Sequence, residues 1–168
     1  MDKSLKLYAT SFAEPRTYIA ASLFIAGNIA LPQLVHLVPN GGITWLPIYF
    51  FTLIAAYQYG WRTGLLTALL SPLINSWLFQ MPPAEALPAI LLKSTLLAFA
   101  AAAAARHFKK VTIPALLIVV LAYQTLGTLG EWVLTQNLNA ALQDFRIGVP
   151  GMALQVFGGY AVLKCLLR

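Results

Sequence analysis

Charged residues are scarce in this chain of 168 residues. Asp, Glu, Lys and Arg together make up 10% of the sequence, whereas 60% of the residues are hydrophobic. A water-soluble domain needs more polar side chains than this to cover its surface, but a bilayer accepts apolar surface on every side of a helix bundle. The composition therefore argues against a soluble domain and indicates a membrane protein.

Cysteine and the residue patterns of catalysis are also rare or missing. The single cysteine, Cys165, excludes an internal disulfide and a metal site built from several cysteines. The sequence has no HExxH motif, no nucleophile elbow, no carboxylate pair at catalytic spacing and no Walker motif. We therefore expect neither an enzyme nor a bound cofactor or metal, and any ATP would be hydrolysed by another protein. The net charge of +6 is divided among short loops and does not predict nucleic-acid binding.

What the sequence does contain is a series of long apolar segments separated by short polar turns. A helix needs about 20 residues to cross the hydrocarbon core of a bilayer. We expect an all-α protein with a single domain over residues 1–168, in which residues 1–16 form a short cytoplasmic lead and residues 137–147 an outer loop or surface helix. The six expected membrane spans cover residues 18–37, 46–59, 63–79, 87–105, 113–134 and 148–167.

The positive charges fall on alternate sides of these six segments. Only Arg146 lies in a connection on the second side, and Lys93 lies inside an apolar segment. Because cationic loops stay in the cytoplasm during membrane insertion, the pattern predicts that both termini are cytoplasmic. The other nine of the 11 Lys and Arg residues share the first side: Lys3, Lys6, Arg16, Arg62, Arg106, Lys109, Lys110, Lys164 and Arg168.

Lys93 and Glu131 are the two ionisable residues expected inside spans, where a charge near the helix centre costs about 2.5–3.5 kcal/mol. Under the expected topology both lie in the outer half of the membrane. They could pair with each other, extend their charged ends towards water, or line a cavity open to the outside. A cavity accounts for the further polar and aromatic side chains at the same depth, which are His36, Asn75, Gln80, Gln124 and Trp132.

Short motifs are spread over essentially the whole chain. The first half contains Gly41-Gly42, Leu46-Pro47-Ile48, Tyr59-Gly60-Trp61, Leu70-Ser71-Pro72-Leu73 and Met81-Pro82-Pro83. The second half contains ALPAILLKS (86–94), GTLGEW (127–132) and ALQDFRIGVPG (141–151). In their order and in the expected topology, these motifs resemble the substrate-binding S components of energy-coupling factor (ECF) transporters, in the version common in the Bacteroides group.

The resemblance implies a multi-pass protein of the bacterial cytoplasmic (inner) membrane, surrounded by lipid, that binds a vitamin or cofactor precursor from outside. Its implied partners are a transmembrane T subunit and two cytoplasmic ATPase subunits. Lys93 would suit a carboxylate or phosphate of the substrate, and Glu131 would accept hydrogen bonds from N–H groups or hold Lys93 in place. With Asp144 and Arg146 on the closing outer loop, the implied substrate-binding residues are Lys93, Glu131, Asn75, Gln80, His36, Trp132, Asp144 and Arg146.

Members of the family often carry an Ala-xxx-Ala pattern in the first span, where small side chains meet the T subunit. Ala26 and Ala30 match this pattern, and Ser22 continues it by one turn. Ordinary close packing between spans is the alternative for these residues. For Trp132 the alternative is a place in the belt of aromatic residues at the membrane interface.

Two other functions remain open. One is a solitary carrier that works without ATPases, a cobalamin carrier included, and the other is a membrane scaffold whose polar residues only join helices. One cobalamin-specific branch of the family uses a cysteine near the third outer loop as a cobalt ligand. This chain has Gln80-Met81 there and its cysteine at the opposite face, so His36 or Met81 would have to replace that ligand.

Overall fold

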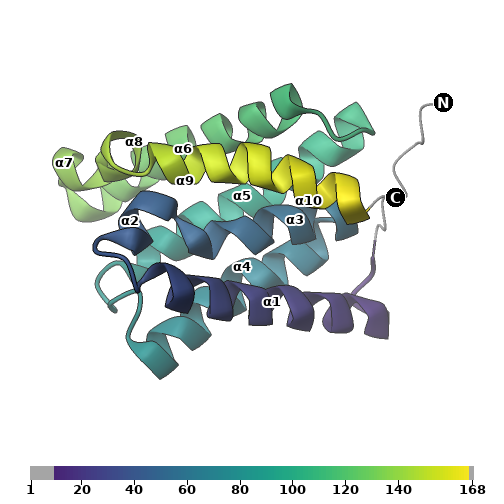
Figure 1. The fold of residues 1–168 in the computed structure, drawn as a ribbon, viewed down its shortest axis with the longest axis horizontal. Coiled ribbons are helices and arrows are strands. Elements are labelled where there is room, and N and C mark those ends of the chain that lie inside the picture. The colour runs from purple at the N-terminus through teal and green to yellow at the C-terminus, as the bar shows by residue number, and fades with distance from the viewer. Residues whose placement is uncertain (1–9, 167–168) are drawn as a thin grey trace.

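The computed structural model describes residues 10–166, and this part of the chain is helical, without strands. Lys3, Lys6, Leu167 and Arg168, which belong to the expected lead and to the end of the last expected span, lie outside the described residues. Two turns of other helix types are η1 (Pro47–Tyr49, a 3-10 turn) and η2 (Leu154–Gly158, a π-helical turn). The α-helices are α1 (Pro15–Val35), α2 (Gly41–Trp45), α3 (Phe50–Tyr59), α4 (Trp61–Phe79), α5 (Leu87–Phe108), α6 (Ile113–Thr135), α7 (Leu138–Ala141), α8 (Gln143–Arg146), α9 (Val149–Ala153) and α10 (Gly159–Leu166) (Figure 1).

Four of the described helical segments are long and apolar enough to cross a membrane: Pro15–Val35, Leu87–Phe108, Ile113–Thr135 and Val149–Leu166. The last of these runs through α9, η2 and α10 without interruption. Large apolar side chains on them face outwards, with exposed fractions of 70% for Leu23, 55% for Leu126 and 60% for Phe157. Extended apolar surface of this kind suits lipid and is rare on water-soluble proteins. The expectation of a helical, membrane-embedded protein is confirmed.

The segment over residues 46–59 is interrupted near its start, at Pro47. Leu46 has a left-handed backbone (φ 46°), and the following Pro47 lacks an N–H, so the chain passes through η1 before α3 begins. α3 is only 10 residues long, and it packs against α1, α4, α5 and α10. Because protein surrounds it, most of α3 is buried, and its fully buried residues are Thr52, Leu53, Ile54, Ala55, Ala56 and Tyr57.

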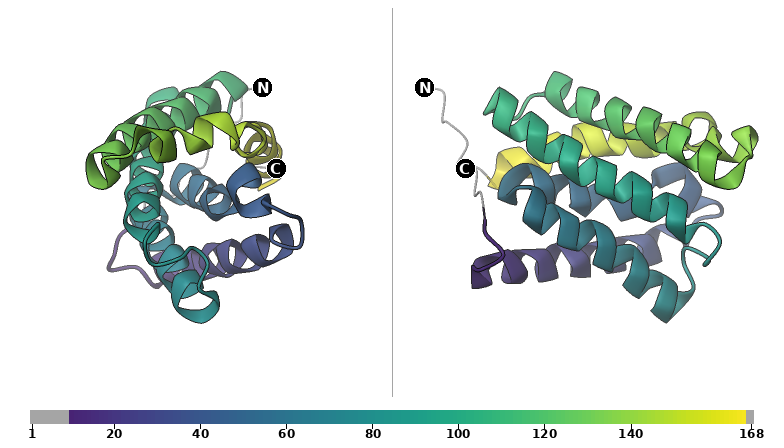
Figure 2. Two further views of the ribbon diagram at one scale, coloured as in Figure 1. Left: turned by 90° about the vertical axis from the view of Figure 1, so that its left-hand side faces the viewer. Right: turned by 180° about the vertical axis from the view of Figure 1, so that it is seen from behind.

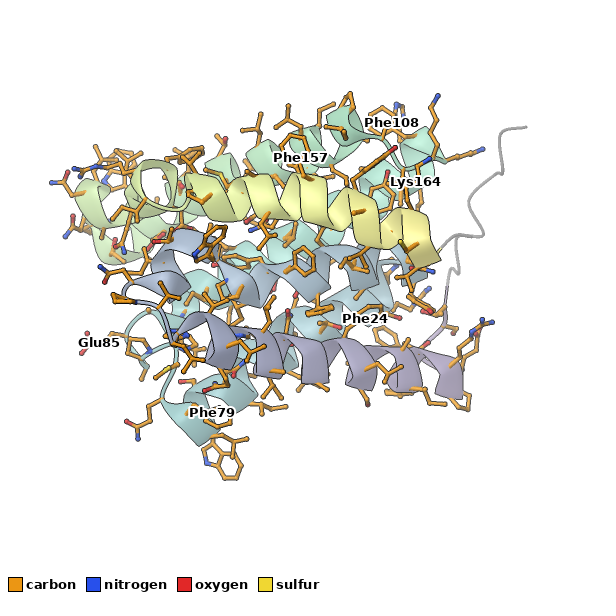
Figure 3. The ribbon with its side chains drawn as sticks, viewed as in Figure 1. Phe24, Phe79, Glu85, Phe108, Phe157 and Lys164 are labelled. Carbon is orange, nitrogen blue, oxygen red and sulfur yellow. The ribbon has the colours of Figure 1, made fainter. Side chains whose placement is uncertain are left out.

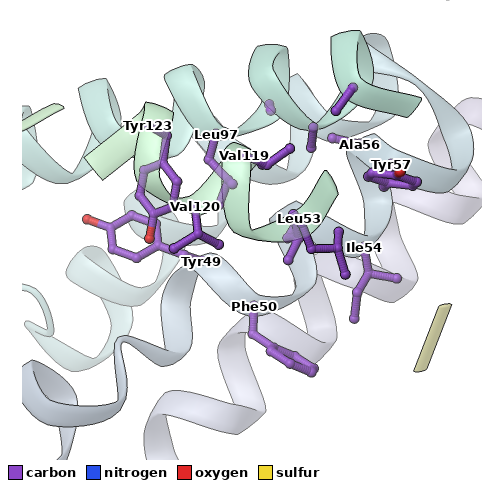
Figure 4. Close-up of a cluster of buried hydrophobic side chains, with 14 of the residues drawn as sticks. Tyr49, Phe50, Leu53, Ile54, Ala56, Tyr57, Leu97, Val119, Val120 and Tyr123 are labelled. Atoms are coloured by element: carbon purple, nitrogen blue, oxygen red, sulfur yellow. The ribbon is translucent and has the colours of Figure 1, made fainter. Parts of the chain in front are cut away.

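The longer helices are arranged around α3, as the end-on view in Figure 2 (left) shows. α5 packs against α4 on one side and α6 on the other, and the last helical segment closes the bundle over α3 and α6. The buried side chains between these helices form one apolar cluster (Figure 4). Within it the rings of Tyr49 and Tyr123 lie 5.5 Å apart, which brings the end of η1 against the middle of α6.

Basic residues gather at one end of the bundle. Arg62 Nη1 donates a hydrogen bond to the Thr10 carbonyl (3.1 Å), and Tyr57 Oη donates one to the Lys110 carbonyl (2.8 Å). Lys164 on α10 also lies at this end, which we call the basic end, while Glu85 lies at the opposite end (Figure 3). α2, α7 and α8 lie together at that opposite end (Figure 1). The alternation of charge along the sequence therefore corresponds to the two ends of the bundle.

Candidate functional site

A cavity of about 570 Å³ lies at the end of the bundle opposite the basic end. Six parts of the chain form its walls: the end of α1, the α2–η1 segment, the connection after α4, the start of α5, the end of α6, and α7 with α8. Prolines end or interrupt the chain's helices around it, because proline fixes φ and removes an N–H donor. The helix-breaking residues on its wall are Pro39, Pro47, Pro82 and Pro83.

Three charged side chains meet on the wall of this cavity. Lys93 Nζ on α5 lies 2.5 Å from Glu131 Oε2 on α6 and 2.8 Å from Asp144 Oδ2 on α8. The contact with Asp144 is a charge-assisted hydrogen bond, which is stronger than a neutral one, and the contact with Glu131 is an ion pair. We call Lys93, Glu131 and Asp144 the triad. The triad joins a short outer helix to two of the long helices.

Burial differs within the triad. The Lys93 side chain is 4% exposed, while the side chains of Glu131 and Asp144 are 16% and 14% exposed. The ammonium group is thus enclosed by its two partners, and the carboxylates keep more of their surface towards the cavity that all three line. A buried ammonium group without partners would be strongly unfavourable, so the two carboxylates account for its position.

A glycine on α6 makes room for the lysine. A Cβ atom added at Gly127 would lie 2.5 Å from Lys93 Cγ, closer than carbon atoms can approach. The aliphatic part of Lys93 therefore runs directly over the backbone of α6, one turn before Glu131. The GTLGEW segment supplies both the glycine that admits the lysine and the glutamate that pairs with it.

Of the other expected site residues, one lies on the cavity wall and the rest lie away from it. His36 lines the cavity, and its Nδ1 lies 2.6 Å from the Pro32 carbonyl oxygen. Asn75 is fully buried away from the cavity wall, where its Nδ2 donates to the Asn28 carbonyl oxygen (2.8 Å) and so joins α4 to α1. The structure also places three exposed residues outside the cavity wall, namely Gln80, Trp132 and Arg146.

Tyr49 lines the cavity although it is not among the expected substrate-binding residues. Its ring touches that of Tyr123, whose hydroxyl donates to Gln155 Oε1 (2.8 Å) and accepts from Gln124 Nε2 (3.1 Å). Gln155 lies in the π-helical turn η2, and such turns are frequent at functional sites. The π-turn could have been recognised only from the backbone, because no residue type marks it in the sequence.

The expected contact strip lies elsewhere on the molecule. Ser22, Ala26 and Ala30 are all exposed along α1. They are not packed against another helix of the described chain, so they leave a face of small side chains open to lipid or to another protein. Small residues allow a second helix to approach closely.

The geometry can hold a small molecule. Ligand cavities commonly have volumes of about 300–1,000 Å³, and this one falls within that range. It combines apolar walls with a few charged groups from different helices, which is the usual composition of a binding site. Within residues 10–166, no group of three or more His, Cys, Asp and Glu side chains is placed to hold a metal ion. No protein-family model, curated protein or solved structure matches this chain.

Proposed function

We propose that this chain is a membrane substrate-binding subunit that takes up a vitamin or cofactor precursor, as the S components of ECF transporters do. The observation that carries the proposal is the cavity of about 570 Å³ with the buried triad on its wall. A scaffold would need neither a cavity nor three charges at membrane depth. Charged groups inside a membrane are costly and usually mark a substrate path or site.

The proposed topology has six spans with both termini in the cytoplasm. The four long apolar segments provide four spans, α4 with its 19 residues provides a fifth, and α3 with η1 and α2 provides the sixth. The basic end would face the cytoplasm, since cationic loops are retained there. The cavity would then open towards the outside of a bacterial inner membrane.

The energy for uptake would come from partner proteins. The sequence has no Walker motif, so ATP hydrolysis is assigned to two ATPase subunits that a T subunit connects to this chain. The exposed strip of Ser22, Ala26 and Ala30 on α1 is the proposed contact with the T subunit. Small side chains there would let the partner helices approach the α1 backbone.

Reconstitution tests the proposal. The protein is purified, its bound small molecules are identified by mass spectrometry, and uptake of the identified molecule is measured in liposomes with and without the T subunit and ATPases. Uptake that requires the T subunit and ATPases supports the proposal. Uptake by this chain alone would identify a solitary carrier, and absence of both bound molecule and uptake would favour a scaffold.

A further inference from the structure

The charges at the cavity do not balance. Lys93 contributes one positive charge, and Glu131 and Asp144 contribute two negative charges, so the triad carries −1 in total (1 − 2). His36 and Tyr49 are the other titratable side chains on the described wall, and neither is a permanent cation. We infer that the cavity recognises a cationic nitrogen group on its substrate, an inference that rests on the proposed function and specifies its substrate class.

Within the triad, the groups that face the cavity are the two carboxylates, which are hydrogen-bond acceptors. The Lys93 side chain is enclosed, whereas the side chains of Glu131 and Asp144 are both more exposed than it. Within residues 10–166, the second oxygens of these carboxylates, Glu131 Oε1 and Asp144 Oδ1, accept no hydrogen bond. An ionised carboxylate can only accept hydrogen bonds, so it selects N–H or O–H donors on a ligand. Lys93 is therefore not placed to bind a substrate carboxylate or phosphate, and its role is to hold the two acids in position.

The apolar surroundings make the net charge of −1 on the triad energetically unfavourable. Apolar residues such as Leu46, Ile48 and Ile90 line the cavity beside the triad, and an uncompensated charge in such surroundings is unfavourable. A cationic ligand would cancel the charge, whereas an anionic ligand would add a second negative charge. A proton on one carboxyl group would also cancel the charge, but it would leave no preference for cationic ligands.

The other residues on the cavity wall indicate the chemistry of the rest of the ligand. Apart from the triad, the described wall is largely proline, aliphatic and glycine residues, together with the ring of Tyr49 and the polar side chains of His36, Asn40 and Gln143. Such a surface offers few polar partners and suits a compact apolar or aromatic body. The expected substrate is therefore a small ring-containing or aliphatic molecule that bears an amine, amidine or related cationic nitrogen.

Three probes of nearly the same shape test the charge preference: benzamidine as the cation, benzamide as the neutral form and benzoate as the anion. Their binding to the full-length protein in nanodiscs is measured by saturation-transfer NMR, with empty nanodiscs as the blank. Benzamidine is expected to bind at least about tenfold more tightly than benzoate, because contacts with desolvated charges are worth this much or more. Benzamide is expected to lie between them.

Two variants separate the triad from the general charge of the protein. Glu131→Gln and Asp144→Asn each bring the triad from −1 to zero, and both are expected to lose most of the preference for benzamidine over benzoate. Glu85→Gln removes the same charge from an exposed residue at the same end of the bundle, outside the cavity wall, and should retain the preference. Using two acids on different helices keeps the test valid if one variant fails to fold.

The outcomes also separate this inference from the proposed function. Equal binding of the three probes, tighter binding of benzoate, or no binding of benzamidine overturns the cationic substrate class. So does a co-purified molecule that carries a carboxylate or phosphate and no cationic nitrogen. That molecule would leave the proposed uptake function standing, which only the reconstituted T subunit and ATPases can confirm or reject.

Discussion

Lys93 on α5 and Asp144 on α8 are joined by a 2.8 Å ion pair across 51 residues of sequence. Through this contact a helix of only four residues is fastened to a long helix within the bundle. Glu131 on α6 completes the arrangement from the other side of the lysine. The buried ammonium group of Lys93 thus helps to hold α8 at the cavity.

The first prediction concerns that ammonium group. Lys93→Met leaves Glu131 and Asp144 side by side without a cation, and removing one partner from a buried ion pair costs about 3–5 kcal/mol. We expect a clear fall in the thermal unfolding temperature of the purified protein. Combining Lys93→Met with Glu131→Gln should recover part of the loss, because it removes one of the two unpaired charges. A Lys93→Met protein as stable as the parent would show that the triad does not form.

The second prediction concerns the glycine beneath the lysine. Gly127→Ala would place a Cβ atom 2.5 Å from Lys93 Cγ, so the lysine or α6 must move. Overpacking of this kind costs about 1–3 kcal/mol of unfolding free energy. Gly159→Ala is the matched control, since its added Cβ atom would meet only Leu53 Cδ2 at 3.1 Å.

Thermal unfolding of the two glycine variants in the same detergent measures this difference. We expect Gly127→Ala to be the less stable protein and to weaken ligand binding, because the triad would be displaced. If Gly159→Ala destabilises the protein as much as Gly127→Ala does, the close contact with Lys93 is not the cause.

The sequence predicted the position of these residues along the bundle better than their direction around a helix. Lys93, Glu131 and Asn75 were all expected at one level near the outer surface. The structure joins Lys93 to Glu131, but it turns Asn75 towards Asn28 on α1 and away from the cavity. Position along an apolar segment gives depth directly, whereas the face that a side chain occupies depends on which helices pack beside it.

Contacts between segments that are distant in the sequence also could not be predicted. Asp144 was expected on the closing outer loop, but no pattern indicated that it would pair with Lys93. The burial of α3 was likewise hidden, because the apolar run over residues 46–59 looks the same whether lipid or protein surrounds it. Only the structure shows that α1, α4, α5 and α10 pack around this short helix.

The third prediction tests the proposed topology. Single cysteines are introduced at Asn40, Glu85 and Asn139 into a Cys165→Ser background and labelled with a membrane-impermeant maleimide on intact cells. These positions should react from outside, and a cysteine at Lys109 should react only after the membrane is opened, because the basic end is expected inside. Labelling of Lys109→Cys on intact cells would reject the topology and the outward-facing cavity.

The last prediction tests the proposed contact with the T subunit. Ala26 is exposed on α1, so Ala26→Trp should leave the fold nearly unchanged, as exposed substitutions usually alter stability by about 0.5 kcal/mol or less. The large ring would keep a partner helix from approaching, and ATP-dependent uptake in liposomes should fall to the level seen without ATPases. Ligand binding should persist, because Ala26 does not line the cavity. Ala103→Trp on α5 is the control at another exposed alanine, and it should support normal uptake. Equal loss of uptake in both variants would mean that α1 has no special role, and loss of binding in Ala26→Trp would point to a damaged fold instead.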